Sequence, residues 1–288
     1  MSLPAASLDK LDDKQKRALI SLLADDDQNV YRTVRQKIIS CGPASLPWLR
    51  EHTLSEDASL RRRAREIVSY FARQEADMKL LAFCLNQGED FDLEQSVLLL
   101  SRTQYPEINP EAYSALLDYF AAELRDRLDL NGEPIQILKI INEYVFRELR
   151  FIGDEHNFYN PDNSYLNRVM DRRIGNTFSL SLVYLLLTRR LRLPMAGVVL
   201  PGHFLCRYQS SRAEIYVDAF RGGSLLTKAD CIKRIVQFRD CFDESSLSPV
   251  SSRRILSRVC ANLHQIYTQR KAADQVDRLQ RYIVALAK

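Results

Sequence analysis

The feature that most constrains the fold of this 288-residue chain is the apolar run from Leu180 to Leu187, which has turn-forming residues at both ends. Gly175 and Asn176 precede the run, and a basic stretch closed by a proline follows it. A helix that is apolar on nearly every side is buried, whereas an amphipathic helix lies at the surface. The sequence therefore predicts a central buried helix, with Thr177 or Ser179 available to cap its first amides.

Two extended segments follow this helix and predict a β-hairpin. The first runs from Gly197 to Tyr208 and the second from Ala213 to Phe220, with the polar turn Gln209–Arg212 between them. A turn centred on that stretch places His203 directly opposite Asp218. Since opposed side chains in an antiparallel pair have Cβ atoms about 4.5–5.5 Å apart, the imidazole and the carboxylate can form a hydrogen bond.

Such a His–Asp pair has two interpretations. In the first, the carboxylate fixes the tautomer of the imidazole and leaves the second ring nitrogen for a group across a cleft. In the second, the two side chains only satisfy each other within the sheet. Both interpretations depend on the register of the hairpin, because a shift of one residue would place the side chains on opposite faces.

The segment from Glu143 to Gly223 resembles a known family. Its motifs are N-S-x-L-N-R-V-x-x-R-R-x-G, S-L-S at the start of the apolar helix, R-R-L-x-L-P, P-G-H-F-L and V-D-x-F-x-G-G. As a set they are similar to those of bacterial transglutaminase-like proteins of the SirB type, which are described as regulators of sirC expression. The resemblance implies an α+β fold with a transglutaminase-like, papain-like core and a small antiparallel sheet.

The transglutaminase-like superfamily uses a Cys–His–Asp triad whose cysteine starts a buried helix. The resemblance implies that His203 and Asp218 are the second and third members of this triad. The nucleophile position, two residues after Gly175, holds Thr177, and Ser179 is the next hydroxyl. A thiol with a pKa of about 8.5 ionises readily, whereas a hydroxyl must lose its proton to a base during attack and needs an oxyanion hole. Cysteine-type chemistry is therefore not expected.

Two functions remain compatible with these residues. The favoured one is a non-catalytic transglutaminase-like protein that serves as a protein–protein interaction or regulatory module. The alternative is a hydrolase or acyl transferase that uses Thr177 or Ser179 with His203 and Asp218. Cys206 is not expected to replace the missing nucleophile, because its position in the strand places it on the opposite face of the sheet from His203.

The loop before the buried helix is expected to border the cleft, as the resemblance implies. Asn163 and Asn167 suit a capping role where the loop meets a helix, and Asn176 directly precedes the buried helix. Arg173 adds positive charge near the predicted mouth, which favours an acidic group or an anionic ligand. A solvated surface is the alternative interpretation of this charge.

Helices are predicted on both sides of the core. In the N-terminal part, Asp27–Ile38 matches Asp57–Val68 at an offset of 30 residues, and each copy follows another helix. This pattern is typical of HEAT-like arrays. A further helix is predicted from Lys228 to Phe242. At the C-terminus, apolar positions predict the antiparallel helices Ser251–Thr268 and Ala272–Ala287, for which the resemblance implies a degenerate tetratricopeptide (TPR-like) unit.

These patterns predict three domains. They are a HEAT-like helical segment at 1–75, the transglutaminase-like core with flanking helices at 76–243, and a TPR-like helical hairpin at 244–288.

Composition narrows the possible partners. A formal charge of +4 is small for this length and gives no case for nucleic acid. The six cysteines form no C-x-x-C pair and lie near no histidine cluster, so neither a metal site, a cofactor nor a disulfide framework is expected. The N-terminus lacks the apolar core of a signal peptide, and no run of about 18 apolar residues is present. We expect a reduced cytoplasmic protein with a protein partner.

Overall fold

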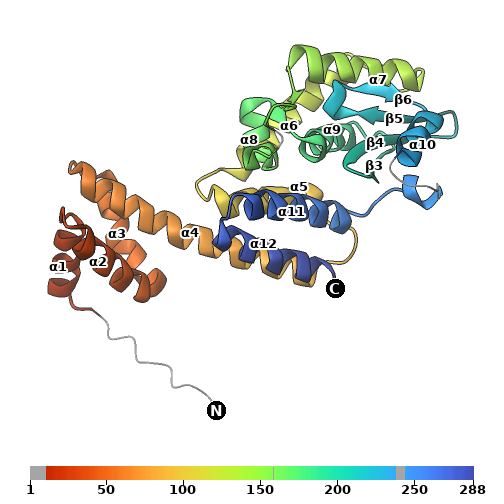
Figure 1. The fold of residues 1–288 in the computed structure, drawn as a ribbon. Helices are drawn as coiled ribbons and strands as arrows, with labels where there is room; N and C mark the ends of the chain where they lie inside the picture. Colours follow the sequence, from red (N-terminus) through yellow and green to blue (C-terminus); the bar gives the residue numbers. More distant parts are fainter. Residues whose placement is uncertain (1–10, 158, 238–243) are drawn as a thin grey trace. The chain divides into compact units, whose positions relative to one another are not determined.

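The computed structural model describes residues 11–157, 159–237 and 244–288. The chain divides into two compact units. The first holds the chain up to Ala76 together with Tyr105–Glu107, and the second holds Asp77–Gln104 and Ile108–Lys288. Figure 1 shows the helices and strands of both units in chain order.

The first unit is helical. Its elements are α1 (Asp13–Leu23), α2 (Gln28–Ser40), η1 (Gly42–Ser45), α3 (Leu46–Arg50), η2 (Glu51–Leu54) and the first part of α4 (Ala58–Asn86). The two repeat aspartates cap their helices, because Asp27 accepts a hydrogen bond from an amide in the first turn of α2 and Asp57 accepts two from the start of α4. Buried Leu23, Ile38 and Ile67 form the core beneath these helices.

The second unit contains the sheet. Its four strands are β3 (Met195–Leu200), β4 (His203–Gln209), β5 (Glu214–Asp218) and β6 (Ser224–Leu226), and they pair in this order, all antiparallel. Two short strands, β1 (Ile152–Gly153) and β2 (Ile174–Gly175), form a separate parallel pair. The prediction of an α+β chain with a small antiparallel sheet is confirmed.

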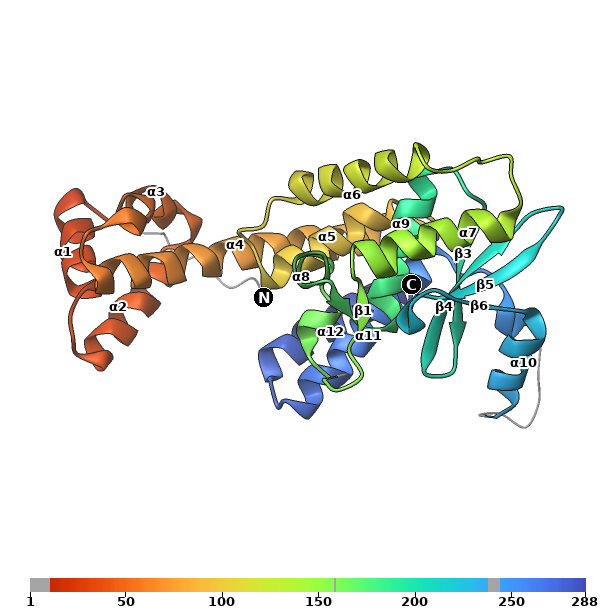
Figure 2. The same ribbon diagram turned by 90° about the horizontal axis from the view of Figure 1, so that it is seen from above.

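Helix α9 (Thr177–Arg190) is the predicted buried helix. Eleven of its 14 residues are buried, which matches its apolar sequence. It packs on one face of the sheet, where the rings of Phe178 and Phe204 lie 5.4 Å apart. Helix α10 (Lys228–Val236) covers the other face, and its Ile235 joins Leu205 in a common core (Figures 1 and 2). The sheet therefore lies between two helices. At the start of β4, Phe204 points toward α9 and Leu205 points toward α10.

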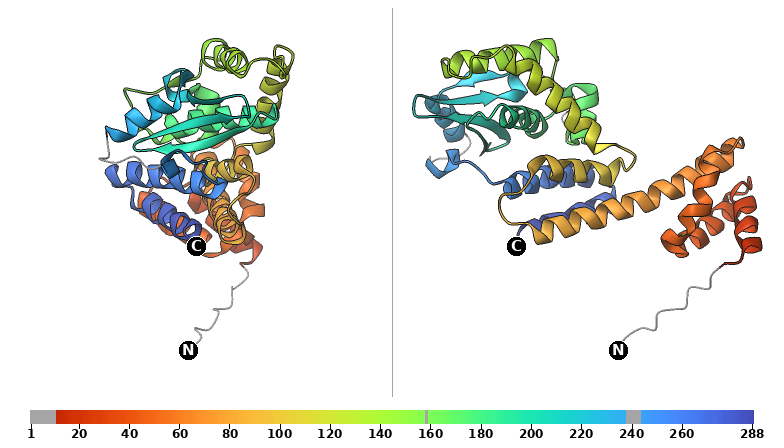
Figure 3. Two further views of the ribbon diagram at one scale, coloured as in Figure 1. Left: turned by 90° about the vertical axis from the view of Figure 1, so that its right-hand side faces the viewer. Right: turned by 180° about the vertical axis from the view of Figure 1, so that it is seen from behind.

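Further helices surround this layer. They are α5 (Leu93–Gln104), α6 (Pro110–Arg125), α7 (Pro134–Asn142) with its π-helical continuation η3 (Glu143–Glu148), η4 (Pro161–Asn163), α8 (Leu166–Arg172), η5 (Ala219–Arg221), η6 (Glu244–Leu247), α11 (Ser252–Gln269) and α12 (Ala273–Leu286). Helices α11 and α12 form the predicted C-terminal hairpin and lie beside α5 (Figure 3). The predicted extension of α10 to Phe242 falls on residues 238–243, which lie outside the described part.

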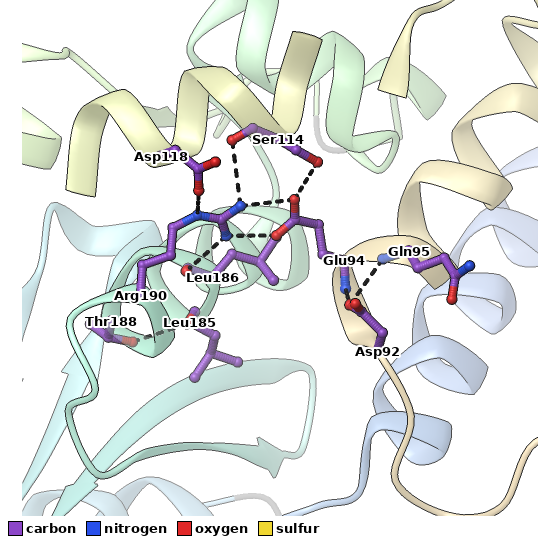
Figure 4. Close-up of polar contacts among 9 residues, drawn as sticks. All are labelled: Asp92, Glu94, Gln95, Ser114, Asp118, Leu185, Leu186, Thr188 and Arg190. Atoms are coloured by element: carbon purple, nitrogen blue, oxygen red, sulfur yellow. Dashed lines mark hydrogen bonds and ion pairs between the residues drawn. The ribbon is translucent and has the colours of Figure 1, made fainter. Parts of the chain in front are cut away.

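The last turn of α9 is tied to two neighbouring helices by Arg190 (Figure 4). Its guanidinium donates to both carboxylate oxygens of Glu94 in α5, at 2.6 and 2.9 Å, and its Nε donates to Asp118 in α6 at 2.6 Å. Ser114 of α6 also donates to Glu94. Arg190, one of the basic residues at the end of α9, therefore fixes the packing of three helices.

Candidate functional site

His203 is the first residue of β4, directly after a tight turn. The sequence predicted one strand from Gly197 to Tyr208, and this is wrong, because the chain reverses at Pro201 and Gly202. Proline presets φ for the first turn position, and Gly202 takes a φ of 64°, which glycine adopts without strain. The turn places His203 at the end of the sheet rather than in its middle.

The register between β4 and β5 also differs from the prediction. Cys206 pairs with Val217 and Gln209 pairs with Glu214, so the predicted register is wrong by two residues. An even shift keeps His203 and Asp218 on the same face, where diagonal neighbours can still touch. The two side chains do form the predicted hydrogen bond, with 2.8 Å between His203 Nε2 and Asp218 Oδ1.

The Asp218 carboxylate is completely buried and bonded on both oxygens. Its Oδ1 also accepts from the amide of Arg221 at 3.2 Å, and its Oδ2 accepts from the Arg234 guanidinium at 2.8 Å. Burial raises the pKa of Asp218, but the hydrogen bonds and charges of His203 and Arg234 outweigh burial and lower this pKa below its usual value. Since a carboxylate only accepts, His203 Nε2 carries the proton of this bond, and Nδ1 is the ring nitrogen that Asp218 does not use.

His203 lines a pocket of about 590 Å³. The turn Leu200–Gly202 forms one wall, and Arg221, Arg234 and Gln237 supply the polar part of the lining. The His203 side chain is 21% exposed, and its Nδ1 has no hydrogen-bond partner among the described residues. Neither arginine was singled out from the sequence. Arg221 stands inside the V-D-x-F-x-G-G motif, whereas Arg234 reaches the site from α10 without any sequence signal.

The two predicted nucleophiles are almost completely buried, and both are bonded to the backbone. Thr177 Oγ1 donates to the carbonyl oxygen of Phe204 at 3.1 Å and accepts from the amide of the same residue at 2.9 Å. Ser179 Oγ donates to the carbonyl of Asn163 at 2.6 Å and accepts from the amide of Asn176 at 3.0 Å. Each hydroxyl therefore already donates to a carbonyl.

None of the polar side chains in the first turns of α9 bonds to the imidazole. Ser181 Oγ donates to the Phe204 carbonyl at 3.3 Å, and Cys206 Sγ lies 3.5 Å from the Ser181 carbonyl oxygen. Burial raises the pKa of the Cys206 thiol, as expected for a small core residue on the α9 side of the sheet. The described residues that line the pocket of His203 do not include Ser181, Cys206, Thr177 or Ser179.

Asn176 is the N-cap of α9, a role that the sequence assigned to Thr177 or Ser179. Its side-chain oxygen accepts from the amides of Phe178 and Ser179, each at 3.0 Å. Asn176 has an extended backbone, as an N-cap residue requires, whereas Thr177 is already helical. Asn176 Nδ2 donates to Ser164 Oγ at 2.8 Å, so both ends of the amide are used by the protein.

Asn163 and Asn167 lie in the interior. Asn163 Nδ2 donates to Asp154 Oδ2 at 2.9 Å and to the carbonyl of Asn157 at 3.0 Å, and its side-chain oxygen accepts from Arg172. Asn167 Oδ1 has no hydrogen-bond partner among the described residues. Asn163 thus organises the loop before α8.

Arg173 ends α8 in a left-handed conformation, with a φ of 60°. Its guanidinium carbon lies 4.9 Å from the ring centre of Phe120 and 4.6 Å from that of Phe151. Desolvation lowers the pKa of Arg173. Neither Arg173 nor Asn163, Asn167 and Asn176 line the His203 pocket, so the cleft-binding role of these four residues stays a prediction.

In the described part of the chain, no group of three or more His, Cys, Asp or Glu side chains could hold a metal ion. Within the same residues, every helix is too short or too polar to span a membrane.

Comparison with known proteins agrees with this geometry. A family model described as the transglutaminase-like superfamily matches residues 111–261. A UPF0162 protein of Xylella fastidiosa (strain 9a5c) is 31% identical over 205 residues, which cover 69% of this chain and 73% of the relative. A UPF0162 protein of Pseudomonas aeruginosa is 29% identical over 192 residues, which cover 64% and 68%.

A further similarity extends to a larger protein. F-box only protein 21 of Mus musculus is 28% identical over 250 residues, which cover 76% of this chain and 39% of the mouse protein. No solved structure gives a significant match. This chain belongs to the UPF0162 family and carries a domain of the transglutaminase-like superfamily.

Proposed function

We propose that this protein is a non-catalytic transglutaminase-like protein whose His203 pocket binds a ligand or partner without covalent chemistry. The observation that carries the proposal is the state of Thr177. It occupies the position of the superfamily cysteine, and its hydroxyl is shared by the amide and the carbonyl of Phe204. A hydroxyl nucleophile must instead give its proton to a base during attack.

The surroundings of Ser179 support the same conclusion. A Cβ placed on Gly175 would lie 2.6 Å from Ser179 Oγ, so the backbone packs directly against this hydroxyl. Ser179 is 1% exposed, which leaves no path for a substrate to its oxygen. A catalytic role for Ser179 would require the start of α9 to open.

The alternative function is a serine- or threonine-dependent hydrolase or acyl transferase. The bond between His203 and Asp218 favours it, because this pair is the base and orienting acid of such enzymes. Among the described residues, no hydroxyl is bonded to His203 Nδ1, and the alternative requires one. The two functions therefore differ in whether Thr177 or Ser179 can react.

Active-site labelling distinguishes them. The intact chain is incubated with a fluorophosphonate probe beside an active serine hydrolase as a positive control, and modified residues are located by mass spectrometry. We expect no modification of Thr177 or Ser179. Stoichiometric labelling of either residue that disappears in His203→Ala would overturn the non-catalytic proposal.

We further propose that the protein acts as a regulator of the SirB type and binds a protein partner. The mouse F-box protein is similar to this chain over 39% of its own length, and a similarity confined to one part of a larger chain supports an interaction module. On this view, the N-terminal helices form a HEAT-like segment and the α11–α12 hairpin a TPR-like unit. Affinity capture with the intact chain tests the partner, and the absence of any reproducible partner would contradict this role.

A further inference from the structure

The His203 pocket has a positively charged lining. Arg221 and Arg234 contribute two positive charges. The buried carboxylate of Asp218, which accepts a hydrogen bond from Arg234, contributes one negative charge. Together these three groups carry a net charge of +1. Among the described residues, no carboxylate lines the pocket itself.

The two arginines are in different states. Arg234 donates to Asp218 and keeps 27% of its side chain exposed, so its guanidinium is positioned and still reaches the solvent. The Arg221 side chain is exposed and has no partner among the described residues, whereas its amide is fixed by Asp218. One guanidinium is therefore held in place, and the other is available to close on a ligand.

A second pocket, of about 480 Å³, lies against the same Leu200–Gly202 turn. Arg254 and Arg258 line it together with several serines, and again no carboxylate is present among the described lining residues. Four arginines thus lie around one turn. Such a cluster attracts anions and raises their local concentration at both pockets.

We propose that the His203 pocket binds the phosphate group of a small phosphate monoester. This inference rests on the proposed non-catalytic function, because it treats the site as a binding site. A phosphate monoester carries a charge of about −1.5 to −2 and has three acceptor oxygens, which suits two guanidiniums and the amide of Gln237 better than a single carboxylate would. The apolar wall of Leu200 and Pro201 is available for the organic part of the ester.

The size of the pocket agrees with this ligand class. Small-molecule sites have volumes of roughly 300–1,000 Å³, and the pocket of about 590 Å³ lies within this range. Since Arg221 is exposed, its attraction for the ligand is screened by salt. Binding should therefore weaken as the potassium chloride concentration rises.

Isothermal titration calorimetry with phenyl phosphate and benzoate tests the inference, because the two compounds share a ring and differ in the anion. We expect phenyl phosphate to bind the intact protein more tightly than benzoate does. Arg221→Gln should raise the Kd for phenyl phosphate by about tenfold or more, the effect of losing one charge-assisted bidentate contact. Arg221 is the best position to change, because its side chain forms no hydrogen bond or ion pair with another described residue.

The matched control is Arg212→Gln, which removes the same charge from the exposed β4–β5 turn and should change the Kd by less than about twofold. An unchanged Kd in Arg221→Gln, equal or tighter binding of benzoate, or no binding of phenyl phosphate by the folded protein would each overturn the inference. Fluorophosphonate labelling of Thr177 or Ser179 would overturn the non-catalytic function instead, so the two failures can be told apart.

Discussion

At the scale of single residues, Thr177 makes a structural contact between a helix and a strand. Its hydroxyl accepts from the amide of Phe204 and donates to the carbonyl of the same residue, so it joins the first turn of α9 to the start of β4. A buried amide left without a partner costs about 1–3 kcal/mol. At the position that the resemblance assigns to the nucleophile, the Thr177 hydroxyl therefore makes a structural contact with the residue after His203.

The contact can be measured by removing the hydroxyl while keeping the shape. We expect Thr177→Val to lower the free energy of unfolding by about 1–3 kcal/mol, because the Phe204 amide loses its acceptor. Thr188→Val is the control, since Thr188 is also buried in α9 but its hydroxyl donates only to carbonyls of its own helix. It should cost less than about 1 kcal/mol. Equal losses in urea unfolding would contradict the structural role of Thr177.

The sequence predicts part of the candidate site. Strand alternation places His203 and Asp218 on one face, and this holds even though the assumed register was off by two. It does not predict Arg234, because the bond to Asp218 depends on how α10 packs over the sheet. The prediction from the sequence also omitted the turn at Pro201 and Gly202, because the apolar pattern on both sides resembles one continuous strand. A Pro-Gly pair is nevertheless a turn signal.

At the scale of elements, local sequence patterns predict the helices well. They do not predict which residues far apart in the chain contact each other. Helix α9 is predicted by its apolar run, and α11 and α12 by their periodic apolar positions. The contacts of Arg190 with Glu94 and Asp118 span 96 and 72 residues along the chain. No local pattern predicts which acids meet a given arginine over such separations, and these contacts set how α5, α6 and α9 pack.

The contacts of Arg190 with Glu94 and Asp118 predict a strong energetic coupling between α9 and its neighbouring helices. Glu94 is 14% exposed, so Arg190→Met leaves a largely buried carboxylate without its guanidinium and should lower the free energy of unfolding by about 3 kcal/mol. The double variant Arg190→Met with Glu94→Gln should lose less than the sum of the single variants, because the unpaired charge is removed.

The neighbouring residue provides the control for this cycle. Arg189 directly precedes Arg190 in α9, and its side chain is exposed. Arg189→Met should change the free energy of unfolding by less than about 0.5 kcal/mol. Urea unfolding of the wild type, the two single variants Arg190→Met and Glu94→Gln, and the double variant gives the coupling energy. Strictly additive losses from Arg190→Met and Glu94→Gln would show that the two helices are not coupled through this pair.

At the scale of the whole molecule, the C-terminal hairpin belongs to the second unit together with the sheet. Arg253 of α11 shows how this is achieved. Its guanidinium is buried and donates to the carbonyls of Ala285 and Leu286 at the end of α12, and to those of Cys84 and Gln87 at the end of α4. One side chain thus satisfies carbonyls at two helix ends that no intrahelical amide can reach.

This arrangement predicts that the hairpin and the core unfold together. A lysine at position 253 keeps the charge but cannot reach four carbonyls at once, so Arg253→Lys should lower the free energy of unfolding by about 2–4 kcal/mol. The control Arg254→Lys changes the exposed neighbour and should cost less than about 0.5 kcal/mol. Thermal unfolding followed by circular dichroism, and by a fluorescent probe attached near β4, should shift together in Arg253→Lys. If the helical signal of the hairpin were lost first while the probe near β4 kept its original transition, residues 244–288 would form an independent domain, as their sequence alone predicts.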